Sequence, residues 1–154
     1  MKAQLFSSDL IAAVFIFLIL IVLLSFAYSQ ALESHSRDLE RKTLEAEGMK
    51  ALENLLRTPG LPENWNSSNA VVIGLSNNNN NILDTNKVSR FFDNISYVSA
   101  KNIFGFGGDF EIKFISSGKT KGSAPNSSVE NIVFFRRFAY YNGSIENVEM
   151  KLWQ

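Results

Sequence analysis

The segment Leu10-Ile-Ala-Ala-Val-Phe-Ile-Phe-Leu-Ile-Leu-Ile-Val-Leu-Leu-Ser-Phe-Ala27 decides the fold of this chain, because apart from Ser25 it contains only apolar residues. Its eighteen residues would form about 27 Å of helix, which matches the hydrocarbon core of a bilayer. We therefore predict a transmembrane helix over residues 5–29. Two alternatives stay open: a secretory signal peptide cleaved near Ala27-Tyr-Ser29, although the apolar run is long for one, and a buried core helix.

Charged residues lie almost entirely outside this segment. Of the 15 basic and 15 acidic residues, only Lys2 and Asp9 fall within the first thirty positions. The net charge is zero, which argues against electrostatic binding to nucleic acid. Cysteine is absent and histidine occurs once, so we expect neither a disulfide framework nor a cysteine- or histidine-rich metal site, and we expect no cofactor.

The helix is predicted to continue as an amphipathic stalk over residues 30–57. This stretch contains no proline and only one glycine, Gly48, and Pro59 and Pro62 follow its end. Apolar residues at three- and four-residue steps predict a stripe that packs on the chain's own domain: Leu32, Leu39, Leu44, Met49, Leu52, Leu55 and Leu56. Opposite charges at helix-neighbour spacing support the same helix: Arg37 and Arg41 against Glu33, Glu40 and Glu45.

Residues 58–154 are predicted to form a β-rich head. Asn142-Gly143 is a strong hairpin signal and joins two expected strands, 132–141 and 145–153. The other expected elements are a short helix over 83–92, capped by Asp84, and a short helix or turn over 97–104, ended by Gly105, Gly107 and Gly108. Strands are expected over 71–73 and 110–114, and loops over 77–81 and 116–128. Three antiparallel strands packed on the long helix would bury an adequate core.

Four Asn-X-Ser triplets lie downstream of the apolar segment, at Asn66, Asn94, Asn126 and Asn142. Such triplets are acceptors for N-glycosylation on extracytoplasmic surfaces. The charges that flank the apolar segment decide little about its orientation. The triplets therefore favour a carboxy-terminal head outside the cell, with each of the four asparagines as a candidate glycosylation site.

No group of residues predicts catalysis. Gly118-Lys119-Thr120 lacks the preceding glycine and the following helix of a phosphate-binding loop. His35 has no partner imidazole, and nothing places the carboxylates of Asp93, Asp109 and Glu111 in a cleft, so we expect them on the surface. Core packing is expected to explain most of an aromatic group: Phe104, Phe106, Phe134, Phe135, Phe138, Tyr140 and Tyr141. We expect a protein that is not an enzyme.

The amino terminus resembles the class III signal peptide of archaeal type IV pilin-like proteins. A short Met-Lys-Ala-Gln leader precedes the polar and acidic Ser7-Ser8-Asp9 and then the apolar helix. In that family a cytoplasmic-side membrane peptidase cleaves after a basic-small pair, which Lys2-Ala3 matches, with Gln4 as the new first residue. The family expects an acidic residue at the fifth mature position. Asp9 falls sixth after a cut behind Ala3 and fifth after a cut behind Gln4.

The resemblance extends into the head. A series of short segments in the head is similar to one that recurs in archaeal pilin-like surface proteins. The series begins with Leu55-Leu-Arg-Thr-Pro-Gly-Leu-Pro-Glu-Asn-Trp65 and continues with Val72-Ile-Gly-Leu75, Leu83-Asp84, Lys87-Val88 and Phe91. It closes with a hairpin that ends in Trp153. The resemblance implies an α+β fold of the type IV pilin-like lollipop kind. In it, residues 1–4 are a leader, and one long amino-terminal helix packs on a small antiparallel sheet.

The function implied by this resemblance is that of a major or minor subunit of an archaeal type IV pilus-like filament for adhesion at the cell surface. The helix would be a membrane anchor first and filament core later, with Asp9 as the assembly charge. The implied partners are the lipid bilayer, identical or related pilin subunits, the prepilin peptidase and the assembly machinery, but not nucleic acid. The alternative is a glycoprotein that stays anchored by a single span and binds a partner or glycan without polymerising.

Overall fold

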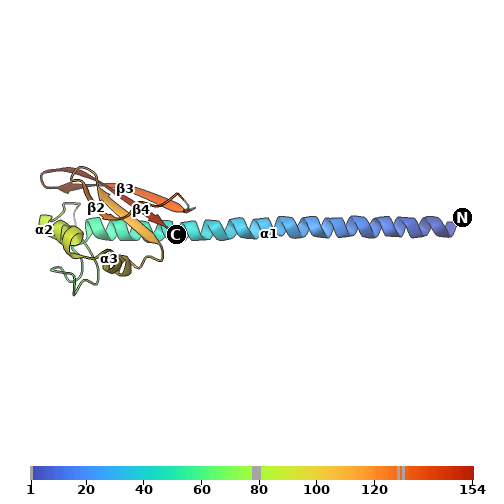
Figure 1. Ribbon diagram of the computed structural model, residues 1–154, viewed down its shortest axis with the longest axis horizontal. Coiled ribbons are helices and arrows are strands. Elements are labelled where there is room, and N and C mark those ends of the chain that lie inside the picture. The colour runs from blue at the N-terminus through green and yellow to red at the C-terminus, as the bar shows by residue number, and fades with distance from the viewer. Residues whose placement is uncertain (1, 78–80, 128, 130) are drawn as a thin grey trace. The chain divides into compact units, whose positions relative to one another are not determined.

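The computed structural model describes residues 2–77, 81–127, 129 and 131–154, with side chains from Asp9 onward. The chain forms two compact units, Met1–Glu40 and Arg41–Gln154. Helix α1 (Lys2–Arg57) contributes to both units, and its amino-terminal part is the blue end of the ribbon in Figure 1. The predicted continuous helix is confirmed. It ends where the hydroxyl of Thr58 donates to the carbonyl of Asn54 at 2.7 Å and Pro59 follows.

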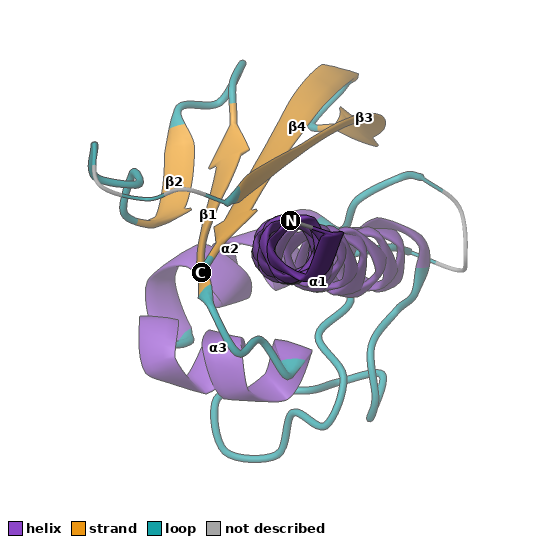
Figure 2. Cartoon of the chain, turned by 90° about the vertical axis from the view of Figure 1, so that its right-hand side faces the viewer, coloured by secondary structure: helices purple, strands orange, loops and turns teal. Residues whose placement is uncertain are grey.

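A four-stranded antiparallel sheet forms one layer of the second unit (Figure 2). Its strands are β1 (Asp109–Phe114), β2 (Lys119–Gly122), β3 (Ile132–Tyr141) and β4 (Ser144–Trp153), in the spatial order β2-β1-β4-β3. The predicted hairpin is confirmed, with Tyr141 paired to Ser144 across the turn. Asn142 and Gly143 both have positive φ angles, 49° and 85°, as a type I′ turn requires.

Two strand predictions are wrong. Strand β2 lies within 116–128, which its glycines, serines and lysines had indicated to be a loop, so the sheet has four described strands instead of three. Residues 71–73 form only an isolated bridge, between Leu61 and Val72. In both places the outcome depends on pairing with another segment, β1 for β2 and Leu61 for Val72, which the composition of the segment itself does not reveal. Of the predicted 77–81 loop, residues 78–80 lie outside the described residues.

Three short helical segments precede the sheet: α2 (Thr85–Ser89), the π-helical turn η1 (Arg90–Asn94) and α3 (Tyr97–Phe104). The predicted cap is confirmed, because Asp84 Oδ1 accepts from the backbone N–H groups of Asn86 and Lys87 at 2.8 and 3.0 Å. Gly105 ends α3 with a left-handed backbone, φ 75°.

The core of the second unit lies between the sheet, the carboxy-terminal turns of α1 and the short helices (Figures 1 and 2). Gly48 permits close packing there, because a β-carbon at this position would overlap the ring of Phe135 from β3. The largest fully buried side chains come from all parts of this unit: Trp65, Phe91, Phe110, Phe114, Leu52, Leu55, Ile73, Leu75, Ile95, Ile112, Met150 and Leu152. The α+β class is therefore confirmed.

The predicted apolar stripe of the stalk divides into two sets. Leu44, Leu52, Leu55 and Leu56 are buried in the core, as expected. Leu32, Leu39 and Met49 are instead about half exposed, so the prediction that they pack on their own domain is wrong. At about 100° of rotation per residue, Leu32 and Leu39 lie on the side of α1 opposite to the buried leucines, so the seven residues do not form one stripe.

Candidate functional site

The apolar segment of α1 is exposed over its whole described length. The large apolar side chains from Leu10 to Phe26 range from 44% exposed at Ile21 to 68% exposed at Leu24. A buried core helix, one of the alternatives from the sequence, is therefore wrong for this chain. Among the described residues, one helix is long and apolar enough to cross a membrane, judged by its length and composition. So large an apolar surface requires lipid or other apolar surfaces around it.

Asp9 stands at the amino-terminal edge of this surface. Its side chain is exposed and forms no ion pair with any side chain that the structure describes. Lys2, Ala3 and Gln4, the predicted leader cleavage residues, belong to α1 by their backbone, but their side chains lie outside the described part. Cleavage at these residues stays a prediction.

Ion pairs replace apolar residues farther along the helix. Arg37 contacts Glu33 at 2.6 Å and Arg41 contacts Glu45 at 3.1 Å, each one helical turn apart. These contacts agree with the spacing seen in the sequence. Because all four side chains are well exposed, the pairs favour a solvated helix but contribute little stability.

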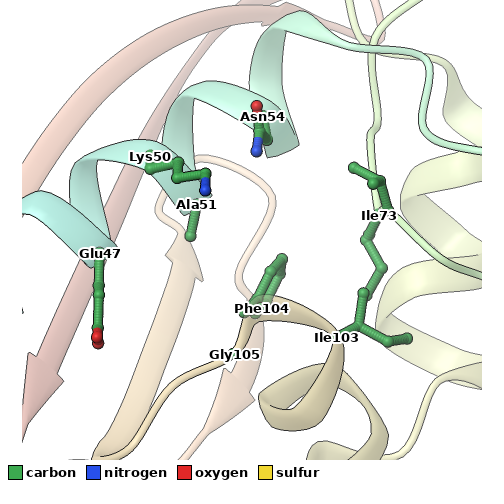
Figure 3. Close-up of a pocket in the computed structure, with 9 residues that line it drawn as sticks. Glu47, Lys50, Ala51, Asn54, Ile73, Ile103, Phe104 and Gly105 are labelled. Atoms are coloured by element: carbon green, nitrogen blue, oxygen red, sulfur yellow. The ribbon is translucent and has the colours of Figure 1, made fainter.

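A pocket of about 420 Å³ lies within the second unit, beside α1 and α3 (Figure 3). Its apolar lining includes Ala51 of α1, Ile73, and Ile103 and Phe104 of α3, and Asn54 also borders it. The remaining lining residues are Glu47, Lys50, Val72 and Gly105. The lining therefore combines apolar side chains with the polar Glu47, Lys50 and Asn54.

The carboxylates considered from the sequence do not form a shared site. Asp109 Oδ1 accepts from Lys101 Nζ at 2.7 Å and from the Tyr97 hydroxyl at 2.9 Å, which joins α3 to β1. These two hydrogen bonds, mainly that from Lys101, lower the pKa of the Asp109 carboxyl. Asp93 is exposed in η1.

The expectation that Glu111 lies on the surface is wrong. Its side chain is only 4% exposed. Glu111 Oε1 lies 3.0 Å from Lys113 Nζ, and Glu111 Oε2 lies 3.7 Å from Lys151 Nζ. Glu111 thus lies beside lysine ammonium groups, as Asp109 does. Such a partner is expected for Glu111, because its carboxylate is withdrawn from water. Neither carboxylate is arranged as a general acid or base.

Two lysines missed by sequence reasoning fix the short helices to the rest of the head. Lys121 of β2 donates to the carbonyls of Phe92 and Ile95 at 2.8 and 2.6 Å, and burial lowers the pKa of this lysine. Lys87 donates to the carbonyls of Pro59 and Ser76. Buried carbonyls need donors, and a long amine side chain can supply them. Lys87 belongs to the series quoted for the resemblance, but no local sequence pattern indicated the role of either lysine.

The remaining chemical candidates have structural positions. Gly118 belongs to the turn before β2, and Lys119 and Thr120 begin that strand, so no helix follows as a phosphate-binding loop requires. His35 is exposed in α1. Within the described residues, no cluster of three or more histidine, aspartate or glutamate side chains is suited to hold a metal ion.

The aromatic group is only partly core. Phe106, Phe135 and Tyr141 are buried, and Phe104 is partly buried against the core. Phe134, Phe138 and Tyr140 are 48–63% exposed, so core packing explains most of the group, as expected, but not these three. They share one face of β3, an edge strand of the described sheet. The sequence could not separate the two faces of β3, because apolar residues occupy both.

All four predicted glycosylation asparagines are exposed. Asn66 follows the buried Trp65 in a loop, Asn94 ends η1, and Asn126 lies in the connection between β2 and β3. Asn142 lies at the tip of the β3–β4 hairpin. The structure does not bring the four asparagines into one site, and the surroundings of the complete Asn-X-Ser triplet differ among them.

Comparison with protein-family models, with curated proteins and with solved structures finds no match to this chain.

Proposed function

We propose that this protein is a pilin-like surface protein whose long helix anchors it in a membrane and later becomes the core of a filament. The observation that carries the proposal is the fully exposed apolar surface from Leu10 to Phe26, on a helix that continues into a folded head. In a membrane, lipid covers this surface. In a filament, the same faces of neighbouring subunits would cover one another.

Asp9 supports a step from membrane to filament. A carboxylate at the edge of an apolar helix is unfavourable in hydrocarbon unless a positive charge is near it. Cleavage after Ala3 or Gln4 would create a new amino group. The amino group of one subunit would then pair with Asp9 of its neighbour, which gives the bundle a defined register.

The arrangement of subunits follows from the same contacts. Helices that pack side by side with an axial offset form an open, head-to-tail interface, and repetition of such an interface produces a filament instead of a closed ring. The head, with its charged and sequon-bearing surface, would face outward. This chain would then be a major or minor subunit, and other pilin-like chains, the prepilin peptidase and the assembly machinery would be its partners.

The first test is the amino terminus of the protein purified from its native membranes. Intact mass and amino-terminal sequencing are expected to show a chain that begins at Gln4 or Leu5. Retention of Met1 to Ala3 would overturn the pilin proposal, and loss of all residues through Ser29 would show a secreted head instead.

The second test addresses assembly. Asp9→Ala is expected to reduce the yield of sheared surface filaments seen by electron microscopy, whereas Asp9→Glu, which keeps the charge, is expected to retain most of it. Membrane levels of both variants are measured by immunoblot as the control. Equal filament yield in Asp9→Ala and the unmodified protein would remove the pairing role of Asp9.

One observation favours a second function, that of a permanently anchored protein that binds a partner through its head. Phe134, Phe138 and Tyr140 expose aromatic surface on one face of β3. Aromatic residues are enriched at binding surfaces. Under this alternative, Phe134→Ser with Phe138→Ser would abolish binding of the partner, and no filament would form in any variant.

A further inference from the structure

We propose that Asn66 is an acceptor of an N-linked glycan on the folded head and that Asn94 is not an acceptor. The inference rests on the outward location of the head in the proposed function. It compares three triplets, at Asn66, Asn94 and Asn142, that the sequence alone does not distinguish. A glycosyltransferase must reach both the amide nitrogen of the asparagine and the hydroxyl two residues later, so the structure around each pair decides which triplet it can use.

Asn66 presents both groups together. Asn66, Ser67 and Ser68 are all exposed and lie outside helices and strands. The Ser68 hydroxyl lies 2.7 Å from Asn66 Oδ1, and the backbone N–H of Ser68 donates to the same oxygen at 2.8 Å. The amide nitrogen of Asn66 has no hydrogen-bond partner among the described residues.

Local hydrogen bonds hold this loop in shape. The backbone N–H of Asn66 donates to Asn69 Oδ1 at 2.6 Å, and the N–H of Ala70 donates to the carbonyl of Asn66 at 3.2 Å. Immediately before the loop, Trp65 is fully buried and its carbonyl accepts from Arg90 at 2.6 Å. The acceptor triplet thus projects from a fixed base, and an enzyme can bind it without opening the core.

Asn94 has an exposed side chain, but its triplet is tied into the fold. Ile95, between Asn94 and Ser96, is 2% exposed and belongs to the hydrophobic core. The Ser96 hydroxyl accepts from the backbone N–H of Ser99 at 3.1 Å and so caps α3. Ser96 is exposed as well, but an enzyme that rearranges this triplet in its active site would expose Ile95 and remove the cap.

The triplet at Asn142 is also less suited than Asn66. Asn142 is exposed at the hairpin tip, but the Ser144 hydroxyl bonds to the carbonyl of Tyr141 at 3.3 Å instead of to Asn142. Asn142 also holds a positive φ of 49° that the type I′ turn requires, which restricts its rearrangement in an active site. For Asn126, the hydroxyl-bearing Ser128 lies outside the described residues.

The modification is a group transfer from a lipid diphosphate-linked oligosaccharide. The amide nitrogen of Asn66 forms a bond to C1 of the first sugar, and the bond from C1 to the diphosphate oxygen breaks. The diphosphate leaves with the electron pair, and the amide nitrogen loses one proton. No oxidation or reduction takes place.

The test is mass spectrometry of proteolytic peptides from the full chain purified from its native membranes. The peptide that contains Asn66 is expected to carry a glycan mass, and the peptide that contains Asn94 is not. Asn66→Gln and Ser68→Ala are expected to lose that mass, and Ser68→Thr, which keeps a hydroxyl, is expected to retain it. Asn94→Gln is the matched control and should leave the glycan unchanged.

An unmodified Asn66 in the native protein, or a glycan on Asn94 in the folded protein, would overturn the inference. Resistance to limited trypsin digestion shows whether the Ser68→Ala variant is folded. Comparison with Ser68→Thr shows whether the glycan is lost because the hydroxyl is missing or because the turn has changed. The amino-terminal sequence of the same sample separates this inference from the proposed function. If the leader is cleaved but Asn66 carries no glycan, only the glycosylation inference is refuted. If Asn66 carries a glycan but Met1 is retained, only the pilin proposal is refuted.

Discussion

Two stretches of the same helix, residues 10–26 and residues 44–56, contain similar apolar residues in opposite surroundings. Leu24 is 68% exposed, whereas Leu55 is fully buried. The second stretch has a sheet, loops and short helices of its own unit around it, but no described residue covers the first. The apolar character of a residue therefore does not decide its burial. The elements beside it do.

The difference also separates two kinds of stability. The head closes its own core and should unfold as a unit, while the amino-terminal stretch depends on a lipid or protein environment outside the chain. Substitutions of the same residue type in the two stretches should therefore affect different measurements. The predictions below use such pairs, from the largest expected effect to the smallest.

Phe110→Ala should lower the free energy of unfolding of the head by about 3–5 kcal/mol, because Phe110 is fully buried in the core. Phe17→Ala, at a side chain 61% exposed in the apolar segment, should leave that free energy unchanged. The measurement is denaturant unfolding of the full chain in detergent, followed by the fluorescence of the buried Trp65. An equal loss of unfolding free energy in both variants would contradict the difference between the two stretches of the helix.

Phe17→Arg should make membrane insertion less favourable by about 3–4 kcal/mol, because the favourable phenylalanine is lost and an arginine near the middle of a spanning helix must be hydrated or paired. The fraction of chain that resists alkaline extraction from membranes is the readout. Leu39→Arg, among the charged residues of the stalk, is the control and should stay in the membrane fraction. Full retention of Phe17→Arg would argue against a spanning role for this segment.

Lys121→Met should destabilise the head by about 1–3 kcal/mol, because the carbonyls of Phe92 and Ile95 would lose the donor that they share. Lys119→Met, two residues earlier in β2, should have a smaller effect, of about 1 kcal/mol or less, because it removes mainly a contact of the ammonium with the Phe92 ring. The same unfolding experiment compares them. A larger loss in Lys119→Met would contradict the assigned role of Lys121.

The smallest effect concerns pH. The lowered pKa of Asp109 means that its contribution to stability is present above the ordinary value of 3.8 and is lost as pH falls through the lowered value. Because Asp109 is about half exposed, we expect less than about 1 kcal/mol. Asp109→Asn should remove this part of the acid dependence in unfolding curves between neutral and strongly acidic pH. If Asp109→Asn leaves the acid dependence of the unfolding free energy unchanged, the stabilising role assigned to the Asp109 carboxylate is wrong.

Sequence reasoning predicted the elements that local signals define. The long helix, the Asp84 cap, α3 with its glycine end and the β3–β4 hairpin each depend on residues close together in the chain, and each is confirmed. Strand β2 was missed because it forms by pairing with β1 and has no strand-like composition of its own. The burial of Glu111 was missed because its lysine partner Lys151 lies on β4, which pairs with β1 but is far from it in the sequence.

For the candidate sites, the sequence determined the apolar segment and the four glycosylation triplets, because both are defined by consecutive residues. Only the tertiary structure decided which apolar residues of the stalk are buried, which aromatic residues of β3 face outward, and which serine hydroxyl lies beside its asparagine. The physical reason is that covalent neighbours set helical period and turn type, whereas burial and hydrogen-bond partners come from residues that folding brings together from distant positions.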